Sequence, residues 1–308
     1  MKIATREAFG EALADLGEKY TNIVVLDADL SGSTKTSSFA KKFPERFFNM
    51  GISEQDMIGT AAGLAVAGKN AFAASFAVFS TGRAYDQIRN TVVYSKLNVK
   101  VIGTHAGILT GEDGATHQML EDLSLMRGLE GMLVLHPADV VETRQIMEFL
   151  VDYEGPAYLR LGRAGVRPIY TMDGYTFELG KGDIIREGKD LCIIATGSTV
   201  SESLIAAEKL QEEGVSVQVV NMASISPFDT KLTAQIAKEF KKIITVEDHS
   251  IRGGLGSCVA EVMAEVGTGA KLTRLGMKGF GESGTPGDLY EKYKLNGEGI
   301  YEQVKEIL

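Results

Sequence analysis

The sequence predicts an α/β fold of two doubly wound domains, and three observations lead to this prediction. Helical periods alternate with short β-branched apolar runs, as is typical of parallel sheets covered by helices. The chain has 308 residues, which suits two domains of about 150 residues each. The alternation also stops after Arg163 and starts again at Leu191. We therefore expect a domain at 1–165, a linker at 166–189 and a smaller domain at 190–308.

The apolar runs and helical patterns place the elements along the chain. In the first domain they predict strands at 23–26, 99–102, 132–135 and 157–159, and helices near 3–18, 53–67, 82–95, 117–128 and 138–152. In the second domain they predict strands at 191–198, 215–222 and 243–248, and helices near 200–213, 230–240 and 255–266. Residues 164–189 carry Pro168 and several glycines between short alternating runs, which indicates a linker with a hairpin.

Composition excludes several classes of protein. A net charge of −9 without a dense basic stripe argues against nucleic-acid binding. No apolar run approaches the roughly 20 residues that a membrane span needs, and the first residues lack the apolar core of a signal peptide. We therefore expect a cytoplasmic protein. Cys192 and Cys258 are far apart and lack the spacing of a metal site, so two buried reduced thiols are the better interpretation.

Glu54 is the most informative single residue because it stands at the predicted start of a helix rich in small residues. Ser53 is a candidate N-cap, and Asp56 three residues later resembles a capping box. The positive end of a helix favours a charged glutamate in the first turn. On these residues alone, Glu54 is either a ligand-binding acid or only a charge at a helix start.

Two polar loops follow predicted strands, where ligand sites of α/β sheets are found. One is the run 27–33, which contains Asp29 and Ser33. The other, 103–118, contains His105 and His117 with acids between them. Two histidines and two acids in one loop fit a metal site or a polar sugar site, and the spacing leaves both open.

Eight segments together carry a resemblance to a known family. They are LDADLSGS (26–33), GISEQ (51–55), SFAVF (75–79), GTHAGILTGEDGATHQ (103–118), LHPAD (135–139), YLRLGR (158–163), ATGSTV (195–200) and VEDHSIRGGLGS (246–257). In this order they resemble the pyrimidine-binding and C-terminal domains of the transketolase family, which depends on thiamin diphosphate. The resemblance covers essentially the whole chain. It implies transfer of a two-carbon ketol unit between sugar phosphates.

The resemblance also implies roles for individual residues. Glu54 would hydrogen-bond N1′ of the aminopyrimidine ring, which lets the amino group of that ring act as a base. Phe76 and Phe79 would stack on the cofactor, and Asp29 and Leu30 would line its cleft. The residues implied for the sugar phosphate are Arg6, Ser33, His105 and Arg163 at the phosphate, Asp113 at the hydroxyl next to the carbonyl, and His117 at the sugar hydroxyls. His105 and His117 join Glu54 as implied catalytic residues.

The chain lacks one part that a thiamin enzyme needs. Such enzymes hold the diphosphate through Mg²⁺ bound to a Gly-Asp-Gly segment followed by asparagines, and this sequence has no such segment. We therefore predict no metal ligand in this chain. An N-terminal transketolase subunit would supply the Mg²⁺ and diphosphate site as partner. We expect a homodimer of this chain within an α2β2 heterotetramer.

Two alternatives to this function stay open. The run Gly82–Gln87 resembles deoxyxylulose-phosphate synthases, so a split enzyme of that kind, or the β subunit of a 2-oxo-acid dehydrogenase, is the second candidate. His105 favours the transketolases, because the synthases have an arginine there. The third candidate, from another class, is a non-catalytic binding protein that retains the fold.

Overall fold

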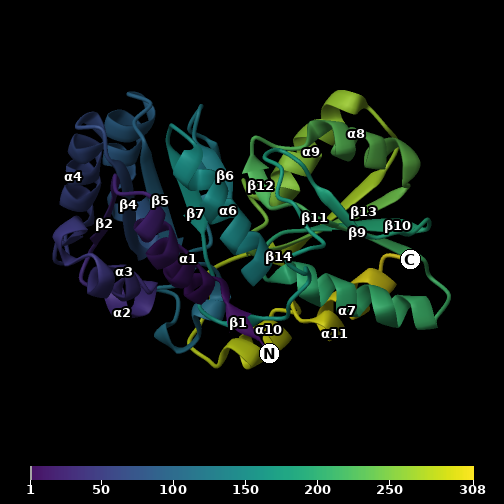
Figure 1. Ribbon diagram of the computed structural model, residues 1–308. Coiled ribbons are helices and arrows are strands. Elements are labelled where there is room, and N and C mark those ends of the chain that lie inside the picture. Colours follow the sequence, from purple (N-terminus) through teal and green to yellow (C-terminus); the bar gives the residue numbers. More distant parts are fainter. Residues whose placement is uncertain (1) are drawn as a thin grey trace. The chain divides into compact units, whose positions relative to one another are not determined.

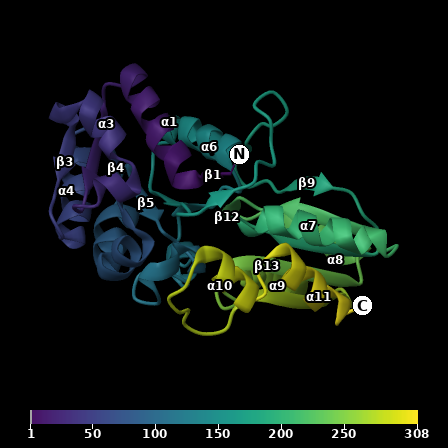
Figure 2. The ribbon, with the colours of Figure 1, turned by 90° about the horizontal axis from the view of Figure 1, so that it is seen from below.

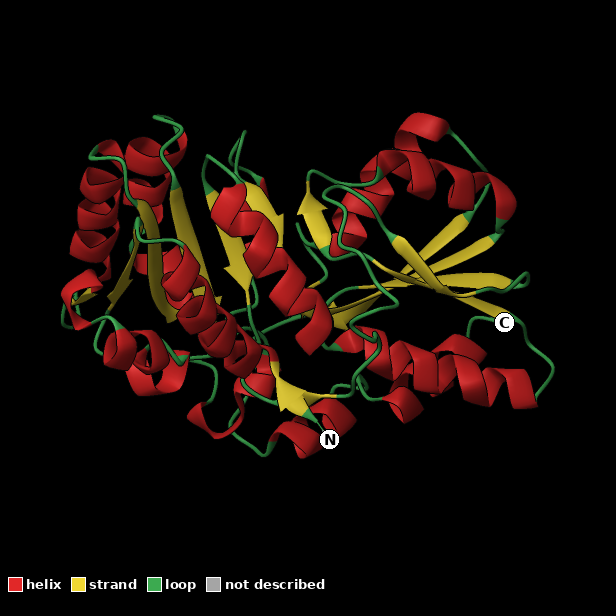
Figure 3. Ribbon diagram, in the orientation of Figure 1, coloured by secondary structure: helices red, strands yellow, loops and turns green. Residues whose placement is uncertain are grey.

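The computed structural model describes residues 2–308, which form two compact units. The first unit contains the chain up to Ala106 together with Leu125–Phe177, and the second contains Gly107–Ser124 together with Glu178–Leu308. Each unit is a mixed α/β structure with parallel strands, shown by type of element in Figure 3. The predicted fold class is therefore confirmed.

The boundaries of the two units differ from the predicted domain ranges in two places. The predicted linker 166–189 is shared between the units, with 166–177 in the first and 178–189 in the second. The segment 107–124, which was expected within the domain 1–165, belongs to the second unit. Helix α5 (Asp122–Arg127) lies where the chain passes back to the first unit. The loop 103–118, which contains His105 and His117, is therefore divided between the units after Ala106.

The sheet of the first unit consists of parallel strands in the order β6-β7-β5-β4-β2-β3 (Figure 1). Their bounds are β2 (Ile23–Asp27), β3 (Phe47–Asn49), β4 (Asn70–Phe76), β5 (Val99–Thr104), β6 (Leu133–Leu135) and β7 (Ala157–Arg160). All residues of β2, β4 and β5 are buried, because strands of a parallel sheet are covered on both faces. Strands β1 (Ile3–Ala4) and β8 (Gly165–Val166) form a separate antiparallel pair.

The helices of the first unit bury apolar stripes. Their bounds are α1 (Thr5–Lys19), α2 (Ser31–Thr34), α3 (Ser37–Lys42), α4 (Glu54–Val66) and α6 (Val140–Asp152), with short helical turns at Pro44–Arg46, Val78–Arg83 and Gln87–Val93. Helix α1 packs against α6 and α3 (Figure 1), and it buries Phe9, Leu13 and Leu16 at helical spacing. Helix α4 packs on β4 through Met57 and Ile58 and small neighbours.

The second unit has a sheet in the order β14-β13-β10-β11-β9, in which only the edge strand β9 runs antiparallel. The strands of this sheet are β9 (Asp183–Arg186), β10 (Leu191–Ala195), β11 (Val217–Asn221), β13 (Lys242–Ser250) and β14 (Lys271–Met277), and the short strand β12 (Ser224–Ser226) is not part of it. The helices are α7 (Thr199–Glu212), α8 (Thr230–Glu239), α9 (Leu255–Val266), α10 (Pro286–Lys292) and α11 (Gly297–Lys305). Helix α7 packs against α11 and α8 packs against α9, on opposite faces of this sheet (Figures 1 and 2).

Most predicted strands and helices are found within a few residues of their expected bounds, but three predictions were wrong. The linker hairpin does not form, because β8 pairs with β1 and β9 pairs with β11. The helix expected at 82–95 is broken into the helical turns Val78–Arg83 and Gln87–Val93. The helix expected at 117–128 is reduced to α5, because the preceding turns contain glycines at positive φ.

Two further local details differ from expectation. Ser53 directly precedes α4, but its side chain makes no capping hydrogen bond, so the predicted capping box is absent. Strand β4 was not predicted, because three of its seven residues are alanine, which is depleted in strands. Cys192 and Cys258 are both buried, as predicted, and no disulfide joins them.

Strand β5 of the first unit contains a fully buried lysine, Lys100. The Lys100 ammonium donates to the carbonyls of Tyr153 at 2.7 Å and Gly155 at 2.8 Å, and to the side chain of Asn98. Burial lowers its pKa from 10.5 to about 7, although Glu154 opposes the shift. Desolvation of the charge outweighs the effect of the nearby carboxylate.

We expect the free energy of unfolding to rise with pH because of Lys100. Its pKa is lower in the folded chain, so between about 7 and 10.5 the unfolded chain binds more protons. The stability of the wild type should therefore increase relative to that of Lys100→Met, by up to about 1.4 kcal/mol per pH unit. Urea unfolding of both proteins across this range measures the difference, and parallel pH profiles would show that Lys100 does not titrate there.

Candidate functional site

The parallel sheet of the first unit brings most of the predicted residues to one edge. Strands β2, β4, β5 and β7 are neighbours and parallel, so their carboxyl ends lie along the same side of the sheet. The residues at or just after these ends are Asp29, Leu30 and Ser33 after β2, Phe76 and Phe79 at β4, His105 after β5, and Arg163 after β7. The topology thus explains why residues distant in sequence can form one site.

Glu54 is a buried carboxylate with a cationic partner. It is the first residue of α4 and is 3% exposed. The Arg83 guanidinium donates to both of its carboxylate oxygens, at 3.3 and 3.2 Å. Both residues, together with Ile52, Ser53 and Gln55, line a pocket of about 330 Å³. An uncompensated buried charge would be costly, so Arg83 keeps Glu54 paired while the pocket stays open to ligands.

Arg83 was not among the predicted site residues. It follows Gly82 at the end of the helical turn after β4, and its guanidinium lies 4.2 Å from the centre of the Phe79 ring. The sequence signal for it was the run Gly82–Gln87, which carried a family resemblance but no role for the arginine. Arg83 thus contacts two of the predicted site residues, Glu54 and Phe79.

Three flat rings stack in a row that begins next to the Arg83 guanidinium. The rings of Phe76 and Phe79 are 5.8 Å apart and inclined by 9°, and the ring of His105 lies 3.7 Å from that of Phe76 at 21°. Such offset contacts add about 0.5–1.5 kcal/mol beyond burial. The stack forms a rigid apolar wall, and His105 is held in it with a positive φ of 56°, which is uncommon for a residue other than glycine.

His105 is also part of a polar network with Arg6. The Arg6 guanidinium lies 3.0 Å from Nε2 of His105 and donates to the carbonyl of Ser33 at 2.8 Å. Since arginine can only donate, Nε2 accepts and the ring proton is on Nδ1, which lies 2.9 Å from the Thr104 hydroxyl. Burial lowers the pKa of Arg6. The negative charge of Glu7 raises this pKa, and the positive charge of Arg163 lowers it. Arg6, Ser33 and His105 thus lie together, and Arg163 is close enough to lower the pKa of Arg6.

Strand β2 ends in a buried acid, Asp27, to which the sequence pattern gave no role, and the loop after β2 contains Asp29. Asp29 is exposed, has a φ of 62° and accepts a hydrogen bond from Asn49 at 3.0 Å. Asp27 is instead fully buried, and its carboxylate accepts from the backbone of Leu30 and from the Thr34 hydroxyl, each at 2.6 Å. Burial raises the pKa of Asp27 against these hydrogen bonds. Asp27 fixes the loop, while Asp29 and Leu30 remain at its surface.

The last two predicted residues, Asp113 and His117, belong to the second unit. Asp113 is exposed at the end of the helical turns Ile108–Asp113, and His117 is half-buried. Nδ1 of His117 lies 2.9 Å from the Thr116 hydroxyl. The carboxylate of Asp113 and the imidazole of His117 are therefore accessible to a polar ligand.

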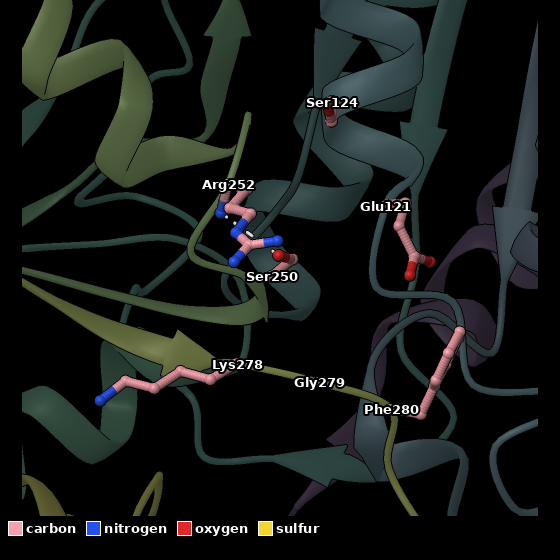
Figure 4. A pocket seen from close by; sticks show the side chains of 7 residues that line it. All are labelled: Glu121, Ser124, Ser250, Arg252, Lys278, Gly279 and Phe280. Carbon is pink, nitrogen blue, oxygen red and sulfur yellow. Dashed lines mark hydrogen bonds between the residues drawn. The ribbon is translucent and has the colours of Figure 1, made fainter.

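The second unit has a further pocket, of about 300 Å³, shown in Figure 4. It is lined by Glu121, Ser124, Ser250, Arg252, Lys278, Gly279 and Phe280. The backbone N–H of Arg252 donates to the Ser250 hydroxyl at 3.2 Å, drawn in Figure 4. The charged groups in this lining are exposed to water. Water screens their charges, so they would add little to the affinity for a ligand.

Neither a metal-binding cluster nor a membrane-spanning helix is found among residues 2–308. No group of three or more histidine, cysteine or acidic side chains in this range is arranged to hold a metal ion. Within the same part of the chain, no helix combines the length and apolar character that crossing a membrane requires.

Comparison with known proteins gives consistent matches over the whole chain. The model of the transketolase pyrimidine-binding domain matches residues 1–168, and that of the transketolase C-terminal domain matches residues 180–300. A Methanocaldococcus jannaschii protein, provisionally named as a transketolase C-terminal section, is 52% identical over 98% of this chain and 95% of its own length.

Two further matches are proteins of divided transketolases. One of the subunits of the apulose-4-phosphate transketolase of Phocaeicola vulgatus is 37% identical over 99% of this chain and 98% of its own. A solved structure described as a split-gene transketolase, an inactive β4 tetramer, superposes with a TM-score of 0.91 and 49% identity, covering 99% of this chain and 98% of that one.

Proposed function

Since the chain belongs to the transketolase family, we propose that it is one of two polypeptides of an enzyme that transfers a two-carbon ketol unit between sugar phosphates. An N-terminal partner subunit would hold Mg²⁺ and the diphosphate of thiamin diphosphate. The observation that carries the proposal is Glu54, a 3% exposed carboxylate that starts a helix and lines a pocket. The apulose-4-phosphate and split-gene relatives support a divided enzyme.

The residues of the first unit fit the aminopyrimidine end of the cofactor. Glu54 offers a carboxylate oxygen for N1′, and the stack of Phe76, Phe79 and His105 offers an apolar wall for a flat heterocycle. When bound, thiamin diphosphate supplies the nucleophilic carbon for ketol transfer. Glu54 holds the proton at N1′, and Arg83 keeps its carboxylate in place before the cofactor arrives.

A second set of residues fits a phosphate group on the sugar. One terminal nitrogen of the Arg6 guanidinium contacts both His105 and the carbonyl of Ser33. The other terminal nitrogen would donate to a phosphate, and Arg163 would provide a second guanidinium. In the second unit, Asp113 and His117 would contact sugar hydroxyls. Dimerisation of this chain and an α2β2 assembly complete the proposal, because closed symmetry is the usual outcome for such interfaces.

Reconstitution tests this function directly. The chain is mixed with an N-terminal transketolase subunit, thiamin diphosphate and Mg²⁺, and ketol transfer from xylulose 5-phosphate to an aldose phosphate is measured. Transfer is the expected result. Decarboxylation of pyruvate in place of ketol transfer would instead identify a deoxyxylulose-phosphate synthase or a 2-oxo-acid dehydrogenase subunit. Neither reaction, with the cofactor bound, would favour the non-catalytic alternative.

Arg163→Ala is expected to affect only phosphorylated substrates. The lost guanidinium acts on a remote phosphate, so the KM for a sugar phosphate should rise, whereas turnover of hydroxypyruvate should change little. Arg167→Ala, which removes an exposed arginine from the same segment, is the matched control. Equal losses on both substrates would show that Arg163 supports the structure and does not bind phosphate.

A further inference from the structure

The segment 107–124 is held by the second unit at its first residues. The carboxylate of Asp248, near the end of β13 and 1% exposed, accepts a hydrogen bond from the backbone N–H of Ile108 at 2.9 Å. Gly107 has a φ of 80°, and a Cβ at this position would collide with the Asp248 carboxylate. The start of the segment is therefore fitted closely to this one side chain.

Asp248 is itself fixed from the other side. The Tyr290 hydroxyl, from α10, donates to its second carboxylate oxygen at 3.3 Å and lies 2.7 Å from the hydroxyl of Ser198. Burial and the charge of Asp248 raise the pKa of Tyr290 well above its usual value, so the phenol stays a donor. A buried acid with two donors in place has one preferred orientation.

The residues after Asp248 hold the far end of the same segment. The backbone N–H of Ser250 donates to the Leu120 carbonyl at 2.9 Å, and Nε2 of the buried His249 lies 3.9 Å from the carboxylate of Asp122. Between the two ends, Gln118 donates to the carbonyl of Glu282 at 2.8 Å. The segment thus has an anchor at each end and one between them, all within the second unit.

We propose that Asp248 is a positioning residue for Asp113 and His117, and that the second unit thereby sets the geometry of the sugar-binding segment. The inference rests on the proposed function, since it assumes that those two side chains contact the sugar. Removing the carboxylate would leave the Ile108 N–H buried without its acceptor, and the segment would relax. Small displacements of substrate-contacting groups are enough to slow an enzyme substantially.

The test is Asp248→Ala in the reconstituted enzyme. We expect kcat/KM for ketol transfer to fall about tenfold to a hundredfold, with an unchanged Kd for thiamin diphosphate, because the aminopyrimidine residues lie in the first unit. Asp248→Asn, which keeps an acceptor for Ile108, should recover most of the loss. Tyr290→Phe is the matched control: it removes the contacts of the Tyr290 hydroxyl with Asp248 and Ser198 but keeps the hydrogen bond from Ile108 to Asp248, so its loss should be smaller.

Hydrogen exchange of the chain alone separates this inference from the proposed function. Amides of 107–120 should exchange faster in Asp248→Ala than in the wild type, while those of β2 should not change. If Asp248→Ala does not fold, Gly107→Ala disturbs the same contact from the side of the segment, because its Cβ would collide with the Asp248 carboxylate, and it serves for both measurements. Wild-type exchange together with wild-type kcat/KM would overturn the inference. Absence of ketol transfer in the wild-type assembly would refute the proposed function but leave the exchange result interpretable.

Discussion

Glu54→Gln is expected to lower ketol transfer by the reconstituted enzyme by about 10²–10⁴-fold, which is the usual contribution of acid–base catalysis. The amide is nearly the same size and still fits beside Arg83, so the fold and the assembly should be retained. It cannot hold a proton at N1′ in the way a carboxylic acid does. Single-turnover rates at saturating cofactor measure the chemical step without the contribution of binding.

Asp56→Asn provides the control for this substitution. Asp56 lies in the same first turn of α4, but its side chain is exposed, whereas Glu54 is 3% exposed. Neutralising it changes the charge near the helix start without touching the pocket, so the rate should stay within a few-fold of the wild type. If the rate of Glu54→Gln were also within a few-fold of the wild type, Glu54 would have no role in the mechanism.

The second large effect concerns the isolated chain, which should bind thiamin diphosphate weakly and show no turnover. The first unit offers groups for the aminopyrimidine, but the sequence carries no Gly-Asp-Gly segment for a Mg²⁺-bound diphosphate. The chain should nevertheless fold and melt cooperatively, because each unit has its own buried sheet. Calorimetric titration of cofactor into the chain alone, and then with partner and Mg²⁺, measures the difference.

Thermal unfolding gives an independent reading of the same prediction. A ligand that binds only the assembled enzyme stabilises it by about 2.7 kcal/mol at a hundred times Kd and leaves the lone chain unchanged. Mg²⁺ without cofactor is the control for a general effect of the ion. Tight, Mg²⁺-dependent binding by this chain alone would contradict the divided-enzyme proposal.

The alternation of apolar runs and helical patterns predicted much of the fold because strands of a parallel sheet are short and mostly apolar. Strands β2 and β5 follow this rule apart from a few residues, among them Asp27 at the end of β2 and Lys100 in β5. Strand β4 was not predicted because alanine is depleted in strands, although all residues of β4 are buried. The predicted hairpin was wrong because β9 pairs with β11, which is distant in sequence. A local sequence pattern does not indicate which distant strand is the partner.

The candidate site was predicted from its motif residues but not from their partners. Phe76 and His105 stand in two of the runs that carry the family resemblance, and the resemblance also implied a role for Arg6. The structure joins these three residues by stacking and a hydrogen bond. Arg83 and Asp248 were not assigned roles, because their importance comes from contacts across 29 and 140 positions. Contacts of that kind depend on the tertiary structure and have no periodic signal.

The passage of 107–124 into the second unit bears on how genes for such chains can be recombined. The chain crosses between the units three times, after Ala106, Ser124 and Phe177. A fusion or exchange made at the linker 166–189 would bring along a segment adapted to a different β13, with Gly107 facing a foreign residue in place of Asp248. Hybrids joined at that point inherit a mismatch inside one folding unit. Exchanging 107–124 together with 178–308 keeps the matched pair intact.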